Sequence, residues 1–229
     1  MKLAIVIAAY NEENSIHSTL SSLPKKLDGI NCIVPIVVDD GSTDRTGELA
    51  EEAGAQVLTH LINRGQGAAL KTGFDYAVKY GYDLVVTFDA DGQHQSEDIP
   101  ALIRPIVDGK VEVTLGSRFK GKKAINMSYS RKIVLLIGVI FTRLISRISV
   151  TDTHNGLRAF SRKALQTIEL MQDKMEHASE ILDQISRHKL SFMEVPVTIK
   201  YSDYSLQKGQ RSSQALKIAL TILFYKMVR

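Results

Sequence analysis

Short apolar runs alternate with stretches of helical periodicity in the first half of the chain. The runs are rich in Val and Ile and cover 3–9, 33–40, 55–60, 84–91 and 111–117. Runs that are apolar along their whole length are typical of strands covered on both faces, as in a parallel sheet. Helical patterns lie between them at about 13–24, 43–53, 66–80 and 96–108. This alternation predicts an α/β fold, a mostly parallel central sheet with helices on both faces.

The second half of the chain has a different character. Residues 120–132 are basic and polar without a strand pattern, which predicts a loop. A helical pattern follows at 131–148, a strand pattern at 192–201 and a final helical pattern at 212–228. No repeat or low-complexity linker divides the chain, so we expect one domain, 1–200, followed by a C-terminal tail and helix, 201–229.

The helix predicted at 131–148 is amphipathic. At about 100° per residue, its apolar side chains share one broad face, made of Ile133, Val134, Ile137, Ile140, Phe141, Leu144, Ile145 and Ile148. Lys132, Arg143 and Arg147 gather on the opposite side. Such a face either packs on the sheet or lies in the interface of a membrane, with arginines toward the headgroups.

Polar motifs follow four of the predicted strands: AYNEE (9–13), DDGSTD (39–44), NRGQGAALKTG (63–73) and DADGQH (89–94). Ligands of doubly wound sheets gather at the carboxyl ends of the strands, so these motifs predict one shared site. Ser42 or Thr43 is the expected N-cap of the helix after the second motif. The glycine-rich motif matches neither the dinucleotide fingerprint nor a P-loop.

Asp89 and Asp91 leave the same buried strand with one small residue between them. Two carboxylates that close repel each other unless a cation lies between them. Mg²⁺ and Mn²⁺ prefer such oxygen ligands and share their remaining positions with phosphates. The alternative is a turn whose aspartates cap the next helix. The serial strand-end motifs favour the metal site.

Composition and charge restrict the kinds of partner that the protein is expected to bind. The formal net charge is +4 and the isoelectric point about 9.0, which suits an anionic partner such as a nucleotide, a lipid phosphate or a membrane surface. No nucleic-acid-binding motif is present, so we expect no nucleic-acid partner. The single cysteine, Cys32, suits a reducing compartment. With no secretory leader pattern and no run of ~20 apolar residues, the sequence predicts a cytoplasmic protein, peripheral at the inner face of the membrane.

The motifs AYNEE, VVDDGSTDRT, NRGQGAALKTG, DADGQH, GSRF and DTHNGLRAFSR, in that order, resemble glycosyltransferase family 2 with the GT-A fold. Within it they resemble the branch of dolichol-phosphate mannose synthases and polyprenyl-phosphate glycosyltransferases. One departure is Ala9, where the family often has Pro. The resemblance implies inverting transfer of a sugar from a UDP- or GDP-sugar to a polyprenyl phosphate, with Mg²⁺ or Mn²⁺ as cofactor. It also implies a nucleotide-sugar-binding half, 1–95, and an acceptor-binding half, 96–200.

The resemblance assigns the donor side. Asp89, Asp91 and Gln93 are the implied metal ligands. The implied nucleotide-sugar residues are Ala9, Tyr10, Asn11, Glu12, Asp39, Asp40, Gly67, Lys71, Asp89, Ala90 and Asp91. Which of Asp39 and Asp40 binds the base stays open. Gly65 and Gly67 allow backbone to approach phosphate, whereas Lys71 is equally well a solvated helix residue and Gly73 a packing contact.

On the acceptor side, Arg118 and Arg131 carry guanidinium forks that match phosphate oxygens. Asp152 is the implied general base if the acceptor is a hydroxyl, with Glu176 and Glu180 as competitors. The expected catalytic residues are therefore Asp91, Arg118 and Asp152. Two alternatives stay open: transfer to a hydroxyl of a lipid-linked or capsule or cell-wall glycan, and a non-catalytic nucleotide-sugar-binding subunit. The helix predicted at 212–228 also suits packing against a second copy of the chain, as in a homodimer.

Overall fold

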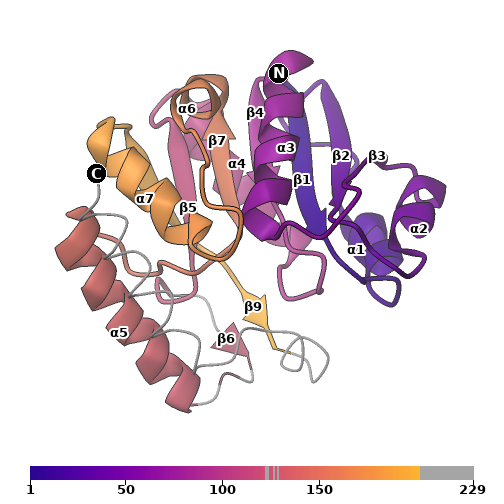
Figure 1. Ribbon diagram of the computed structural model, residues 1–229. Helices are drawn as coiled ribbons and strands as arrows, with labels where there is room; N and C mark the ends of the chain where they lie inside the picture. The colour runs from indigo at the N-terminus through magenta and orange to yellow at the C-terminus, as the bar shows by residue number, and fades with distance from the viewer. Residues whose placement is uncertain (122–123, 126, 128, 202–229) are drawn as a thin grey trace.

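The computed structural model describes residues 1–121, 124–125, 127 and 129–201. Its centre is a seven-stranded sheet (Figure 1). In spatial order the strands are β3 (Gln56–Thr59), β2 (Cys32–Asp39), β1 (Lys2–Ala9), β4 (Leu84–Thr87), β7 (Arg158–Ser161), β5 (Val113–Ser117) and β8 (Phe192–Pro196). β7 pairs antiparallel with both neighbours, and the other pairings are parallel. The mostly parallel sheet is confirmed.

Helices cover both faces of the sheet, as the sequence predicts. One face carries α1 (Ile16–Ser22), α2 (Thr46–Glu52) and α4 (Ile99–Val107). The other carries α3 (Gln66–Lys79), α6 (Arg162–Thr167) and α7 (His177–Arg187) (Figure 1). The three-layer arrangement leaves the carboxyl ends of the parallel strands open at one edge.

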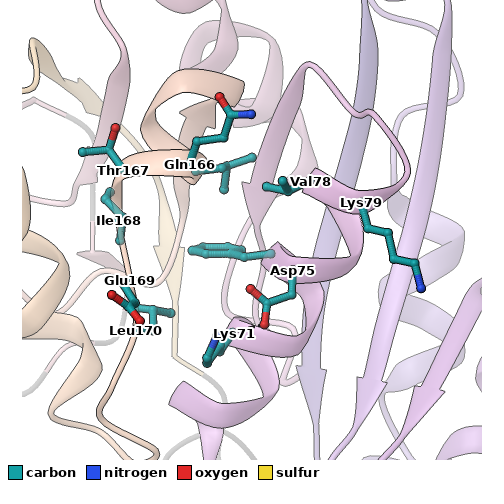
Figure 2. A pocket seen from close by; sticks show the side chains of 11 residues that line it. Lys71, Asp75, Val78, Lys79, Gln166, Thr167, Ile168, Glu169 and Leu170 are labelled. Carbon is teal, nitrogen blue, oxygen red and sulfur yellow. Dashed lines mark hydrogen bonds and ion pairs between the residues drawn. The ribbon is translucent and has the colours of Figure 1, made fainter.

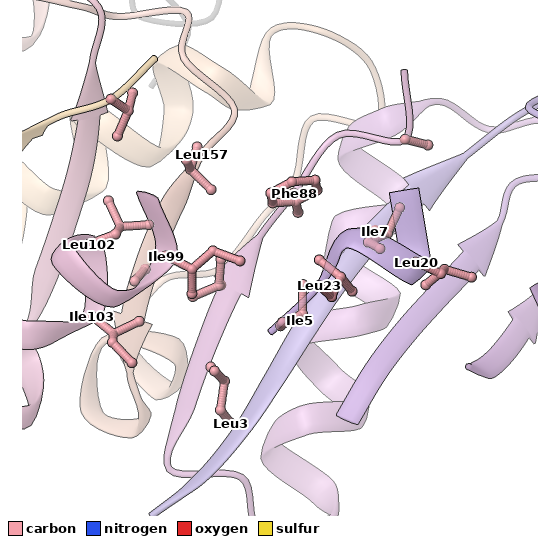
Figure 3. Packing of buried hydrophobic residues seen from close by; sticks show 14 of the residues in the cluster. Leu3, Ile5, Ile7, Leu20, Leu23, Phe88, Ile99, Leu102, Ile103 and Leu157 are labelled. Carbon is pink, nitrogen blue, oxygen red and sulfur yellow. The ribbon is translucent and has the colours of Figure 1, made fainter. Parts of the chain in front are cut away.

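The side chains of β1 alternate between two cores. Leu3, Ile5 and Ile7 point toward α1 and α4 (Figure 3), whereas Ala4 and Val6 belong to the core under α3. Burial on both faces is the reason why the whole strand is apolar. On the α3 side, a Cβ on Gly73 would lie 2.3 Å from Val6 Cγ1, so glycine lets the helix approach the sheet. Gly73 is a packing contact.

Several predicted elements need correction. α2 begins at Thr46, and neither Ser42 nor Thr43 caps it; the Asp44 carboxylate accepts the Thr46 N–H at 3.0 Å instead. The predicted loop contains the short strand β6 (Ala124–Ile125), which pairs with β9 (Ile199–Lys200). The single strand predicted at 192–201 is therefore two strands, β8 and β9. β7 and α6 were not predicted, because each is short and β7 lies within the motif at 152–162.

The amphipathic helix α5 spans Tyr129–Ser146 and contacts α7 at the outer side of the molecule (Figure 1). Its protein-facing side is formed by Val139, Thr142 and Ser146, all buried. Ile137 and Ile140 of the predicted apolar face are 61% and 59% exposed, and Ile133, Leu136 and Tyr129 are exposed as well. The interpretation that this face packs on the sheet is wrong for Ile133, Ile137 and Ile140, whereas Ile148, just after the helix, is buried in the core.

Some predictions fall outside the described part of the chain. They are the side chains of Arg131, Phe141, Leu144 and Ile145, and the helix at 212–228. Among the described helices, none has both the length and the apolar character needed to cross a bilayer.

Candidate functional site

The two aspartates after β4 are each held by neighbours. Asp89 Oδ2 lies 2.7 Å from His94 Nε2, and Asp89 Oδ1 accepts a hydrogen bond from Gln66 Nε2 at 3.1 Å. Asp91 accepts the backbone N–H of Gln93 at 3.0 Å and its side-chain amide at 2.8 Å. The sheet edge therefore brings Asp89, Asp91 and Gln93 together, as predicted for a metal site.

The electrostatics of the pair suit a cation. Burial, and next the negative charge of Asp89, raise the pKa of Asp91 to about 6. Burial also opposes ionisation of Asp89, but the charge and hydrogen bond of His94 outweigh it and hold the pKa of Asp89 below its usual value. One carboxylate is thus an anion and the other resists ionisation beside it, a strain that a divalent cation would relieve.

The protein alone offers few metal ligands here. Within the described residues no group of three or more His, Cys, Asp and Glu side chains is arranged to hold a metal. Two carboxylates and the amide oxygen of Gln93 fit a Mg²⁺ or Mn²⁺ ion that completes its shell with water and substrate phosphate. The residues present therefore fit the implied metal.

The structure distinguishes Asp39 from Asp40. Asp40 accepts the N–H groups of Arg64 at 3.0 Å and Gly65 at 2.7 Å, and lies 2.6 Å from His60 Nδ1. Through these contacts Asp40 holds the loop before α3 in place. Among the hydrogen bonds of the described residues, the Asp39 carboxylate accepts only the Ser42 N–H, at 3.0 Å. Asp39 therefore has the freer carboxylate.

The turn after β1 is tied to the turn after β2. Asn11 has φ +53°, and its Oδ1 accepts the Thr43 N–H at 2.9 Å. Glu12 N–H donates to Thr46 Oγ1 at 2.7 Å. Tyr10 next to them is 44% exposed, whereas Ala9 and Ala90 are buried. Tyr10, Asn11 and Glu12 thus lie beside Asp39, while the two alanines are placed to contribute backbone.

The start of α3 is not an open phosphate site. Ala68 N–H donates to the Asp173 carbonyl at 3.0 Å, and a Cβ on Gly65 would lie 2.5 Å from that same oxygen. A Cβ on Gly67 would clash with the Gln172 carbonyl. These glycines admit the backbone at 172–173, where the sequence suggested phosphate. The first N–H groups of a helix are free to bind an anion only when no carbonyl takes them.

Lys71 lies apart from the carboxylates. It forms an ion pair with Asp75 at 2.9 Å. Figure 2 shows it at one end of a separate hollow of about 500 Å³ between α3 and the segment that contains α6. The structure therefore does not bring Lys71 together with Asp89 and Asp91.

Arg118 and Asp152, predicted for different acceptors, pair with each other. Arg118 Nε donates to Asp152 Oδ2 at 2.6 Å, and the Arg118 backbone N–H donates to the same oxygen at 3.1 Å. Arg118 Nη1 also donates to the hydroxyl of Tyr201 at 2.5 Å. All three side chains are buried. Burial opposes the charge of Arg118, but Asp152 and Tyr201 outweigh it and raise the pKa of the guanidinium.

Of the two competing glutamates, Glu180 has hydrogen bonds that hold backbone in place. Glu180 accepts the N–H groups of Met171 at 3.1 Å and Gln172 at 3.0 Å, which fixes the segment over the start of α3. Glu176 occupies the N-cap position of α7 without a capping hydrogen bond from its side chain. Glu194 on β8 accepts the Thr151 N–H at 2.6 Å and so holds the turn that carries Asp152. The Glu180 side chain therefore holds the backbone of residues 171–172 in place.

The model of glycosyl transferase family 2 matches residues 4–169. The chain belongs to this family. A UDP-N-acetylglucosamine–dolichyl-phosphate N-acetylglucosaminyltransferase of Methanococcus voltae is 36% identical, over 97% of this chain and 95% of that protein. An undecaprenyl-phosphate mannosyltransferase of Micrococcus luteus is 32% identical, over 86% and 83%. The relatives confirm the resemblance to the polyprenyl-phosphate branch.

A solved structure confirms the GT-A architecture. Glucosyl-3-phosphoglycerate synthase from Mycobacterium tuberculosis, in complex with Mn²⁺, uridine diphosphate and its product, superposes with a TM-score of 0.73. The superposition covers 96% of this chain and 79% of the synthase chain, and the two sequences are 22% identical. A likeness at this identity shows the fold.

In this family 2 chain, sequence reasoning missed Gln66, His94, Tyr201 and Arg158 as parts of the site. Gln66, His94 and Arg158 lie inside the quoted motifs, but no spacing rule says which motif residue touches an aspartate. Tyr201 is 83 residues from Arg118, so only the folded chain brings them together.

Proposed function

We propose that the protein is an inverting transferase that moves a sugar from a UDP- or GDP-sugar to a polyprenyl phosphate. The observation that carries the proposal is the buried guanidinium of Arg118, held by Asp152 and Tyr201. After His94 and His177, its positive charge also helps to lower the pKa of Asp89. An anionic acceptor and an anionic donor need cations on both sides of the reacting bond. The similar transferases are named for dolichyl phosphate and undecaprenyl phosphate, which supports the same choice.

The donor binds to the half at 1–95. Asp89, Asp91 and Gln93 hold Mg²⁺ or Mn²⁺, which supplies Lewis-acid neutralisation of the diphosphate leaving group when bound. The Asp39 carboxylate, which has fewer partners than that of Asp40, accepts a hydrogen bond from the nucleotide base. The exposed ring of Tyr10 lies next to Asp39. His94 and Gln66 keep the Asp89 carboxylate in one orientation.

The acceptor binds to the half at 96–200. A phosphate oxygen is already ionised and attacks the anomeric carbon without a base, on the face opposite the diphosphate, so the configuration inverts. Arg118 orients that phosphate with the guanidinium N–H groups left after its contacts to Asp152 and Tyr201. Asp152 is a positioning residue in this scheme, because it holds the guanidinium. Arg131 is a second candidate for the phosphate.

The alternative acceptor is a hydroxyl of a lipid-linked or cell-wall glycan, with Asp152 as the base. The two hydrogen bonds that Asp152 accepts from Arg118 disfavour it, since they make the carboxylate a weaker base. A non-catalytic nucleotide-sugar-binding subunit is disfavoured by the complete aspartate pair.

The lipid reaches the site along the membrane. Tyr129, Ile133, Leu136, Ile137 and Ile140 form an exposed apolar face on α5. Contiguous apolar surface of this kind is typical of membrane or protein contact. We propose that α5 lies in the headgroup region at the inner face of the cell membrane, close to the acceptor half.

The direct test incubates the protein and Mn²⁺ with a panel of UDP- and GDP-sugars and polyprenyl phosphate, followed by mass spectrometry of the extracted lipid. The matched control is the polyprenol that lacks the phosphate. We expect a glycosyl monophosphate lipid with one donor and no product from polyprenol. Transfer to a lipid-linked glycan, with none to polyprenyl phosphate, would overturn the proposal.

A further inference from the structure

Arg158, the first residue of β7, has a buried guanidinium whose hydrogen bonds within the described residues go only to backbone carbonyls. Its Nε donates to the Asn155 carbonyl at 3.0 Å, its Nη1 to the Ala178 carbonyl at 3.2 Å and its Nη2 to the Thr153 carbonyl at 3.0 Å. In the described part of the chain it forms no ion pair with a carboxylate. Three carbonyls from two separate segments thus converge on one cation.

The carbonyls at 153 and 155 belong to the loop that forms one wall of the Asp89 site. Gly156 in this loop packs directly against the aspartate. A Cβ added to Gly156 would lie 2.6 Å from Asp89 Oδ2 and 2.7 Å from Oδ1. Thr87 Oγ1 of β4 donates to the Gly156 carbonyl at 2.5 Å from the other side. The position of the Gly156 backbone therefore sets how much room the Asp89 carboxylate has.

A charge buried without a carboxylate partner is costly, and an apolar side chain of similar volume would fill the space at lower cost. Burial lowers the pKa of Arg158 to about 10, so the group still carries its charge at neutral pH. The nearby charges of Asp152 and Asp89 act in the opposite direction. A cation kept at this cost, and aimed at one loop, indicates a function beyond packing.

We propose that Arg158 is a positioning residue for the donor metal site: it draws the loop at 153–156 against Asp89, so that Gly156 confines the carboxylate in its metal-binding orientation. Arg158 and Gly156 lie in the half assigned to the acceptor, yet they shape the site assigned to the donor. The inference rests on the metal site of the proposed function.

The test measures the dissociation constant for Mn²⁺, alone and with UDP or GDP, from the electron paramagnetic resonance signal of free Mn²⁺. Arg158→Lys keeps the charge but cannot span three carbonyls, and Gly156→Ala keeps Arg158 but crowds Asp89. We expect each to weaken Mn²⁺ binding at least tenfold at pH 7.5. Arg158→Met, which also removes the charge, should weaken it further where it folds.

Two matched controls separate positioning from general destabilisation. Arg162 follows the other end of β7, and its Nε likewise donates to a carbonyl, that of Tyr82, at 3.0 Å. Gly73 has an equally tight Cβ environment, but in the core under α3. Arg162→Lys and Gly73→Ala should lower the melting temperature and leave Mn²⁺ affinity within twofold of the wild type.

Each remaining outcome contradicts the inference. Unchanged Mn²⁺ affinity in both Arg158→Lys and Gly156→Ala, with the wild type binding normally, overturns the positioning role and leaves the proposed function standing. Equal weakening in the controls, in step with melting temperature, also overturns it, because it reduces Arg158 to a structural contact. A wild type that binds no Mn²⁺ overturns the proposed metal site and this inference together.

Discussion

The donor and acceptor sides of the site are built in different ways. On the proposed donor side, Asp91 contacts Gln93 and Asp89 contacts His94, both close in the chain, and Asp89 also accepts a hydrogen bond from Gln66, 23 residues away. On the acceptor side, Arg118 contacts Asp152, 34 residues away, and Tyr201, 83 residues away. The donor site is thus a set of turns at strand ends, whereas the acceptor site is assembled from distant segments.

This difference has an energetic consequence. Burial, and next the negative charge of Asp89, raise the pKa of Asp91, and a bound cation would offset both effects. The acceptor cation is already matched by a buried carboxylate and a phenol. We therefore expect the proposed donor side to gain stability on binding a metal, whereas the contacts of Arg118 on the proposed acceptor side are formed without any substrate.

The largest expected effect comes from removing a donor carboxylate. Asp91→Ala should reduce transfer on the order of 10²–10³-fold or more, as loss of a preorganised electrostatic group does, and should abolish Mn²⁺ binding. Asp75→Ala, which breaks the exposed pair with Lys71, is the matched control and should stay within twofold. Initial rates with and without EDTA provide the measurement. An active Asp91→Ala enzyme would contradict the donor site.

The donor side was also the part that the sequence could predict. Asp89 and Asp91 follow a buried strand with one residue between them, so strand position places them together, whereas Gln93 was implied only by the resemblance. The pairing of Arg118 with Asp152 could not be predicted, because it depends on β7 entering the sheet antiparallel between β4 and β5. The role of the glycine-rich loop was misjudged for a similar reason. Its glycines accommodate the backbone at 172–173, a contact without a local pattern.

The next effect separates the two acceptors. Arg118→Ala should lower kcat/KM for polyprenyl phosphate at least tenfold, because each charge-assisted contact is worth ~1.5–3 kcal/mol. Asp152→Asn should cost distinctly less if no base is needed. Either change leaves one buried partner uncompensated, so both should lower the melting temperature and stability cannot explain a difference in rate. An inactive Asp152→Asn beside a near-normal Arg118→Ala would favour a hydroxyl acceptor.

A smaller effect is expected at the membrane side of the acceptor half. Replacing Ile137 and Ile140 by Ser should lower binding to anionic liposomes roughly threefold to tenfold, since partly immersed side chains contribute ~0.7–1.4 kcal/mol of transfer energy. Val139→Ser, on the buried side of the same helix, is the control and should lower the melting temperature instead. Sedimentation with liposomes at low and high salt gives both readings. Unchanged binding in the double variant would exclude α5 as the contact.

The smallest effect is a stability change that reports the cost of ionising Asp91 in its buried position beside Asp89. Asp91 has a pKa of about 6 in the folded protein, against an ordinary value of 3.8. In the metal-free protein the folded state therefore keeps a proton that the unfolded chain has lost, and stability falls as pH rises from about 4 to 6. Asp91→Asn removes this penalty. With EDTA at pH 7.5 it should melt above the wild type, by about 2–4 °C per kcal/mol relieved, and the difference should vanish near pH 4.

Mn²⁺ should raise the melting temperature of the wild type more than that of the variant, because only the wild type holds the second carboxylate that the cation neutralises. A variant no more stable than the wild type at pH 7.5 would mean that the two aspartates are not strained without metal, and the contrast with the preorganised acceptor side would fail.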